Sequence, residues 1–218
     1  MPLFSFSKKV TGPYKESSTN LIYQLLFCDN IELYKENTTK PHSYPFDILF
    51  SANHTPADLQ KLIDDSSSES RIKILAYNQQ LAMGYKPLKK ELLAVIVEMG
   101  LDNGLDVLAS FNNGTARYIN QAGKMIIWET TDETFHALTN DLFLKAWDVI
   151  NQIGPWDKPR RPWPAKGLVR ISFLVSDGLY FGEAPINVLF NDPLAKPSLT
   201  AATALMNYLV TRTGTNLG

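Results

Sequence analysis

The stretch from Leu92 to Glu129 constrains the fold more than any other part of the chain, because three turn signals separate its short apolar runs. Asn103-Gly104 and Asn113-Gly114 are typical of two-residue hairpin turns, in which both central positions need a positive φ. Gln121 to Lys124 predicts a third reversal. The pattern therefore predicts four antiparallel strands, and each turn fixes how its neighbouring strands pair.

A second hairpin is predicted nearer the C-terminus, where Leu168–Ser176 and Leu179–Glu183 flank Asp177-Gly178. Apolar residues at helical spacing, with cap residues beside them, predict helices before, between and after these strand regions. Hairpins covered by helices are typical of α+β proteins. We therefore expect an α+β fold, with a mainly antiparallel sheet of hairpins at about residues 92–129 and 168–183 and helices packed against it.

The helices are predicted mainly from their start signals. Thr55-Pro56 supplies a hydroxyl N-cap followed by proline in the first turn. Ser66 and Glu69 have the spacing of a capping box for the next helix. The predicted helices are Thr19–Asp29, one starting at Thr55, Ser66–Met83, Asp132–Ile153 and Pro197–Thr211, and short extended segments are expected at Ile31–Tyr34 and Phe46–Ser51.

The domain organisation is predicted from the absence of a flexible linker in the sequence. We expect one continuous domain over residues 1–218, a size at which a chain buries roughly 70% of its unfolded surface. The alternative that stays open is an N-terminal subdomain of residues 1–84 followed by a sheet–helix unit of residues 85–218.

Charge and cysteine content indicate the class of protein. The chain has 21 Lys and Arg against 22 Asp and Glu, a formal net charge of −1, which argues against a nucleic-acid partner. The lone Cys28 cannot form an internal disulfide, as expected in a reducing compartment, and we expect it in or near the core. Met1–Val10 lacks the pattern of a signal peptide, and the apolar run Leu92–Val97 is too short for a bilayer span. These features predict a cytoplasmic protein without a membrane partner.

Motifs for cofactors, metals and nucleophilic catalysis are absent from the sequence. The histidines at 42, 54 and 136 do not have the spacing of a metal site. The chain also lacks the glycine-rich nucleotide-binding patterns and the GxSxG nucleophile motif. We therefore expect no cofactor and no metal.

Two-residue turns predict which side chains share a face of the sheet. A one-residue change in any turn would move the partner strand's side chains to the opposite face. With two-residue loops, one row contains Val97, Ser110, Arg117 and Trp128, and the adjacent row on the other face contains Glu98, Ala109, Tyr118 and Ile127.

Glu98 is the most unusual residue of these rows, because it ends the continuous apolar run that begins at Leu92. A carboxylate in a strand covered on both faces must be paired, hydrogen-bonded or shifted in pKa, and it is a candidate acid, base or ligand-binding group. The alternative is that the strand has reached the rim of the sheet by Glu98, where the carboxylate is solvated.

Three further side chains gain a role from the predicted pairing. Arg117 opposite Trp128 would form a cation–π pair or hold an anionic ligand beside a stacking surface. Tyr118, in the Glu98 row, is a candidate for orienting a ligand. In the second hairpin, Arg170 is expected to form a cross-strand ion pair with Glu183.

The segment from Gly154 to Pro164, called the bridge below, has the most unusual composition in the chain. It contains four prolines with Trp156 and Trp163, and Arg160 and Arg161 lie inside a PxxP spacing. Such a segment favours an extended path and resembles a ligand for aromatic-lined grooves. The alternative is a rigid crossover loop whose tryptophans pack on the sheet.

These features favour a non-catalytic binding or protein-interaction protein, because tryptophan, tyrosine and arginine are enriched at interface hot spots. The partner would be a protein or a small molecule. The alternative is a small-molecule enzyme that uses Glu98 and Asp106 as acid and base beside the sheet, although the predicted faces separate these two carboxylates. A structural subunit of a larger assembly is the third possibility. The sequence does not define the oligomeric state.

Overall fold

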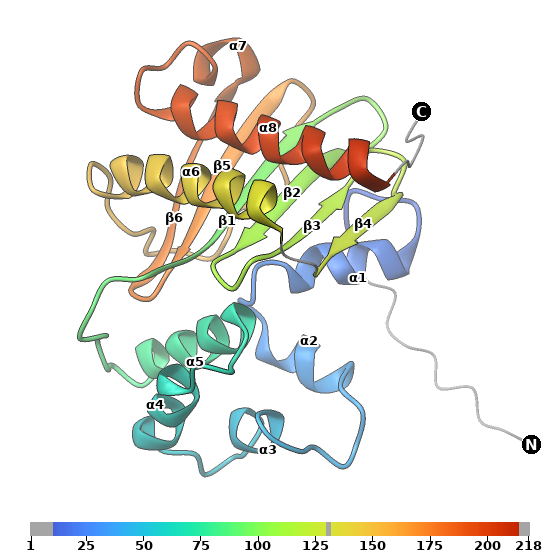
Figure 1. Cartoon of the computed structure of the whole chain (residues 1–218). Helices are drawn as coiled ribbons and strands as arrows, with labels where there is room; N and C mark the ends of the chain where they lie inside the picture. The colour runs from blue at the N-terminus through green and yellow to red at the C-terminus, as the bar shows by residue number, and fades with distance from the viewer. Residues whose placement is uncertain (1–10, 130–131, 214–218) are drawn as a thin grey trace, which may run out of the picture.

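The computed structural model describes residues 11–129 and 132–213, and these form an α+β fold around one antiparallel sheet (Figure 1). The described residues contribute six strands in the order β4-β3-β2-β1-β5-β6. The predicted fold class is therefore confirmed. The signal-peptide argument and the outer ends of the predicted domain lie outside the described residues. The strands are β1 (Leu92–Gly100), β2 (Leu105–Phe111), β3 (Thr115–Ile119), β4 (Met125–Trp128), β5 (Leu168–Val175) and β6 (Gly178–Pro185).

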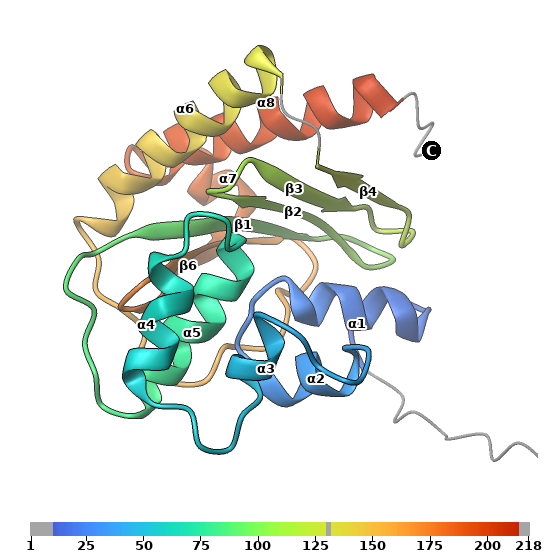
Figure 2. The same cartoon turned by 60° about the horizontal axis from the view of Figure 1, so that its bottom comes forward.

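Helices cover both faces of the sheet, which gives three layers (Figure 2). On one face lie α6 (Glu133–Ile150) and α8 (Ala195–Thr213), and they pack on alternate residues of β1, β5 and β3. The N-terminal helices pack on the other face and share an apolar core with it. They are α1 (Ser17–Leu25), α2 (Ile31–Glu36), α3 (Phe46–Leu49), α4 (Pro56–Asp64) and α5 (Ser70–Ala82), and a further short helix, α7 (Ile186–Leu189), follows β6.

Cap chemistry explains where several helices begin. Thr55 caps α4 through a capping box with Asp58, as its sequence predicts. Asp132 caps α6 by accepting a hydrogen bond of 2.9 Å from the Phe135 amide. The predicted box at Ser66 is wrong, because α5 starts at Ser70 with Glu69 as its N-cap. The sequence thus placed these helices correctly but placed one start too early.

Two segments predicted to be extended are helical. Ile31–Glu36 forms α2, because the side chain of Asn30 caps it by accepting a hydrogen bond of 3.1 Å from the Leu33 amide. Phe46–Leu49 forms the single turn α3 after Pro45. Apolar spacing is a weak signal in segments this short, and in α2 the Asn30 cap outweighs it, whereas α3 has no side-chain cap.

The strand register differs from the prediction because the hairpin loops are longer or are placed differently. Phe111 pairs with Thr115, so the loop contains three residues and ends at Gly114, which has a φ of 78°. The Gly114 amide donates to the Phe111 carbonyl at 3.0 Å, the bond of a tight turn followed by a left-handed residue. Gly123 plays the same part between β3 and β4, with a φ of 80°.

The observed register changes which residues lie opposite one another across the sheet. Glu98 pairs with Val107, while Arg117 pairs with Ala109, in the row of Ile96. Glu98 and Arg117 therefore lie on the face of the N-terminal helices, whereas Tyr118 lies on the face of α6 and α8. Trp128 pairs with Ala116 and also lies on the face of α6 and α8. The predicted partners are therefore wrong from β2 onward, where Val97 pairs with Leu108 and not with Ser110, but the predicted face is wrong only for β3.

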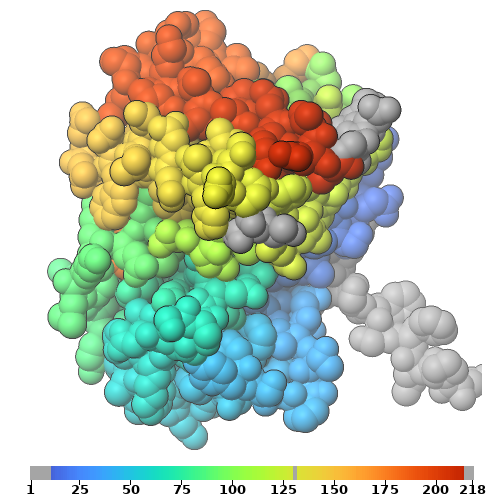
Figure 3. Space-filling model, in the orientation of Figure 1, coloured from blue at the N-terminus to red at the C-terminus, as the bar shows by residue number. Residues whose placement is uncertain are grey.

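The helices on each face shield the apolar side chains of the sheet from solvent. In the space-filling view α6 and α8 cover the upper part of the visible face, and the N-terminal helices form the lower part (Figure 3). Cys28 is 1% exposed, which confirms its predicted core position. Within the described ranges, no helix combines the length and apolar character that a bilayer span requires.

Candidate functional site

The buried carboxylate of Glu98 lies between α1 and the paired strands β1 and β5. Glu98 is 0% exposed, so the prediction of a solvated rim position is wrong. The Tyr23 hydroxyl of α1 donates a hydrogen bond of 2.6 Å to Glu98 Oε1. On the other side, Arg170 Nη1 lies 3.6 Å from Glu98 Oε2. Because β1 continues to Gly100, Glu98 lies inside the sheet and not at its rim, and α1 covers it there.

Arg170 connects this carboxylate to the edge strand and to the bridge. Its Nε donates to Glu183 Oε2 at 2.8 Å, and this cross-strand ion pair confirms the prediction. Its Nη1 and Nη2 donate to the backbone carbonyls of Arg161 and Pro162 at 3.2 and 2.6 Å. A single guanidinium, 2% exposed, therefore holds the bridge against β5 and β6.

Burial controls the electrostatics of this network. It raises the pKa of Glu98 above the ordinary value, against the opposing effect of the nearby Arg170. Burial and the neighbouring carboxylate also raise the pKa of Tyr23, which keeps its hydroxyl a hydrogen-bond donor. Glu98, Tyr23 and Arg170 therefore form a buried, hydrogen-bonded network that holds α1, β1 and β5 together.

Arg160 provides a second attachment for the bridge. Its Nε donates to Asp29 Oδ2 and its Nη2 to Gln24 Oε1, both at 2.6 Å. The guanidinium carbon also lies 3.8 Å from the centre of the Phe27 ring. Arg160 thus ties the bridge to the end of α1 and the residues after it.

The outer side of the bridge presents rings and cations together. Trp163 is 41% exposed, and the side chain of Arg161 is 50% exposed. Trp156 packs edge-on against Phe181 of β6, with ring centres 5.1 Å apart. The Arg161 guanidinium lies 5.1 Å and the Lys158 ammonium 5.5 Å from the centre of the Trp156 ring. We call the exposed side chains of Trp163, Arg161 and Lys158 with the Trp156 ring the bridge surface.

The other residues predicted as site candidates lie apart from the bridge. Arg117 forms an ion pair of 2.7 Å with Glu129. Trp128 stacks on Phe135 at 5.8 Å from the opposite face of the sheet, so the predicted cation–π pair between Arg117 and Trp128 is wrong. Burial raises the pKa of Tyr118, and the charge of Asp106 and a hydrogen bond to it raise this pKa further. The network around Glu98 therefore reaches the bridge, through Arg160 nearby and through the bond of Arg170 to the Arg161 carbonyl, but includes none of these residues.

Tyr23 is the main member of this network that sequence reasoning missed. It is separated from Glu98 by 75 positions. Its place in an apolar helical pattern carries no signal of a carboxylate partner. Among residues 11–129 and 132–213, no cluster of three acidic, histidine or cysteine side chains is arranged to hold a metal ion.

Comparison with known proteins adds no functional assignment. No model of a known protein family matches the chain, and no curated protein is recognisably similar to it in sequence.

Proposed function

We propose that this chain is a non-catalytic binding protein that recognises a protein partner through the bridge surface. The observation that carries the proposal is the pairing of exposed Trp163 and Arg161 with a backbone fixed from beneath by Arg170. Tryptophan and arginine are the residues most enriched among interface hot spots.

The attachment of the bridge favours binding because a segment that is already ordered loses little conformational freedom when a partner docks. Arg170 fixes the carbonyls of Arg161 and Pro162, and Arg160 fixes the neighbouring turn to Asp29. The exposed side chains are therefore presented on a backbone that is held at two points.

The partner that fits this surface is an acidic segment of another protein. The charged groups of Arg161 and Lys158 both lie within 5.5 Å of the centre of the Trp156 ring, and both residues are exposed. Arg161 also lies 3.7 Å from Glu183, but half of its side chain remains accessible to solvent. Carboxylates on the partner would pair with these cations while apolar side chains contact Trp163. We place this interaction in the cytoplasm because Cys28 is a free, buried thiol.

The alternative of a carboxylate enzyme has less support from the geometry. A general acid or base must reach the proton that it transfers. Glu98 is fully buried beneath Tyr23 and Arg170. The other candidate, Asp106, accepts a hydrogen bond of 2.8 Å from the Gln121 amide and belongs to the opposite face.

The test is a comparison of proteins captured from host extract by the unmodified chain and by two bridge variants, Trp163→Ala and Arg161→Glu. Leu144→Ala is the matched control, because Leu144 is 66% exposed on α6, away from the bridge. A partner captured by the unmodified chain and by the control, but lost with both bridge variants, supports the proposal once the purified pair shows the same order of affinities. Equal capture by all four chains would overturn it.

A further inference from the structure

A second concave surface lies away from the bridge, between α2, α3 and the start of α5. It is a pocket of about 350 Å³, within the range of roughly 300–1,000 Å³ for sites that take small molecules. Its walls combine aromatic rings with one ion pair. The lining residues that matter here are Tyr34, Tyr44, Phe46, Glu69, Arg71 and Ile72.

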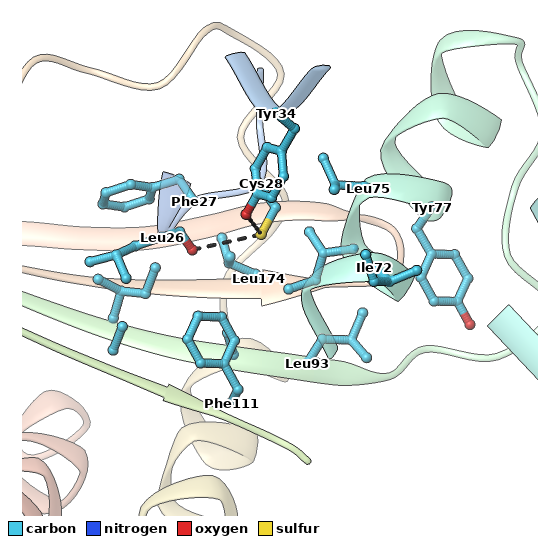
Figure 4. Close-up of a cluster of buried hydrophobic side chains, with 14 of the residues drawn as sticks. Leu26, Phe27, Cys28, Tyr34, Ile72, Leu75, Tyr77, Leu93, Phe111 and Leu174 are labelled. Carbon is cyan, nitrogen blue, oxygen red and sulfur yellow. Dashed lines mark hydrogen bonds between the residues drawn. The ribbon is translucent and has the colours of Figure 1, made fainter. Parts of the chain in front are cut away.

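The position of each aromatic ring is fixed by the surrounding protein. The Tyr34 hydroxyl donates to the Leu25 carbonyl at 2.6 Å. It also contacts Cys28 Sγ at 3.2 Å (Figure 4). Phe46 stacks on Phe50 with ring centres 5.2 Å apart and planes inclined by 21°. These contacts leave an apolar wall that needs little rearrangement to accept a ring.

The third ring, Tyr44, stands at the mouth of the pocket, where it is 51% exposed. Its hydroxyl donates to Asp65, which also accepts a hydrogen bond of 2.8 Å from the Ser67 amide. These bonds hold the pKa of Asp65 at about 2. Asp65 thus holds Tyr44 in place, and its carboxylate already accepts hydrogen bonds from Tyr44 and Ser67.

The polar end of the pocket is a single ion pair. Arg71 Nη2 lies 2.7 Å from Glu69 Oε2, and the two side chains are 31% and 54% exposed. An ion pair that is partly open to solvent contributes little to stability, so its members can separate to meet a ligand. Once separated, they present one cation and one carboxylate beside the aromatic walls.

We infer that this pocket binds a free α-amino acid with an aromatic side chain. The carboxylate of the ligand would pair with Arg71, its ammonium with Glu69, and its ring would lie against Tyr34 and Phe46. This class of ligand satisfies both charges of the pair and the apolar walls together. A purely anionic or purely cationic ligand would leave one member of the pair without a partner in the pocket.

The experiment is isothermal titration of the full chain with four probes that remove one chemical feature at a time. L-phenylalanine carries all three features, 3-phenylpropionate lacks the ammonium, 2-phenylethylamine lacks the carboxylate and L-alanine lacks the ring. We expect L-phenylalanine to bind most tightly. The loss of either charged group should weaken binding roughly 10- to 100-fold, the effect of losing a charge-assisted hydrogen bond.

Two variants assign each charge to its residue. Arg71→Met should weaken L-phenylalanine and 3-phenylpropionate but not 2-phenylethylamine, and Glu69→Gln should weaken L-phenylalanine and 2-phenylethylamine but not 3-phenylpropionate. Leu144→Ala on α6, at an exposed position outside the pocket and the bridge, is the control and should bind as the unmodified chain does. No saturable binding of L-phenylalanine would overturn the inference. So would an equal loss for every probe in both variants, because it would indicate a change of pocket shape alone. Either failure would leave the protein-binding proposal untouched.

Discussion

Arg170 faces Glu98 across the pairing of β1 with β5, and its Nη1 atom lies 3.6 Å from Glu98 Oε2. The two side chains are only 3% and 0% exposed. Because the same guanidinium also bonds to Glu183 and to two bridge carbonyls, one buried cation joins the centre of the sheet to the proposed binding surface.

Removal of this cation should destabilise the fold strongly. Arg170→Met removes the buried cation beside Glu98 and the donor of the two carbonyls, and leaves Glu183 only its longer contact of 3.7 Å with Arg161. Breaking a buried pair costs about 3–5 kcal/mol. Urea denaturation measures the free energy of unfolding. The control is Arg161→Ala, whose side chain is half exposed, and its effect should stay below about 1 kcal/mol. Equal effects of the two substitutions would contradict the anchoring role of Arg170.

The stability of the chain should depend on pH through Glu98. Burial raises its pKa above the ordinary 4.5, so the folded chain keeps a proton that the unfolded chain has already released. The free energy of unfolding should therefore fall as the pH rises from about 4.5 through the folded pKa, by up to about 1.4 kcal/mol per pH unit.

Glu98→Gln should remove this pH dependence, because glutamine still accepts the Tyr23 hydrogen bond but does not titrate. Glu133→Gln, at an exposed carboxylate of α6, should leave it in place. Denaturation series at several pH values measure both variants. A wild-type slope that persists in Glu98→Gln would assign the dependence to another group.

The close approach of the bridge to the sheet can be tested at Gly100. A methyl group there would overlap the carbonyl oxygen of Ala165 and would lie 2.9 Å from that of Pro164. Gly100→Ala should therefore cost about 1–3 kcal/mol, the usual effect of overpacking. Gly182→Ala in β6 is the matched control, because nothing lies within 4 Å of its added methyl group. Thermal unfolding of both variants gives the comparison, and similar melting temperatures would argue against this contact.

The exposure of Trp163 should dominate quenching of tryptophan fluorescence. Trp163 is the tryptophan with 41% exposure, whereas Trp156 is held against Phe181. Trp163→Phe should remove most of the acrylamide-accessible emission, and Trp147→Phe should remove little of it. Stern–Volmer plots of the two variants measure this difference. A larger loss in Trp147→Phe would contradict the exposed position of Trp163.

Local signals in the sequence predict the strands and most helices because caps and apolar spacing act over a few residues. Thr55 and Asp132 cap the helices that they precede, and Arg170 pairs with its strand neighbour Glu183. The register could not be predicted as reliably. Gly114 has the same positive φ in a two-residue turn and at the end of a three-residue loop, but the two loops place opposite side chains on the core face.

Contacts between distant segments account for the remaining errors. Glu98 looked solvated because its strand seemed to end, and only the packing of Tyr23 from α1 explains its burial. The pocket between α2 and α5 was not predicted either. Its Tyr34 wall lies in a segment that the apolar spacing indicated to be extended, and the Asn30 cap makes that segment helical.

The most direct test of the bridge as a binding surface is photocrosslinking in host cells. The photoreactive residue p-benzoylphenylalanine would replace Trp163 in one chain and Leu144 of α6 in another, so that both probes occupy exposed positions on different faces. The proposed function predicts one dominant crosslinked protein at position 163 that is absent at position 144. The same set of adducts at both positions, or none at position 163, would contradict it.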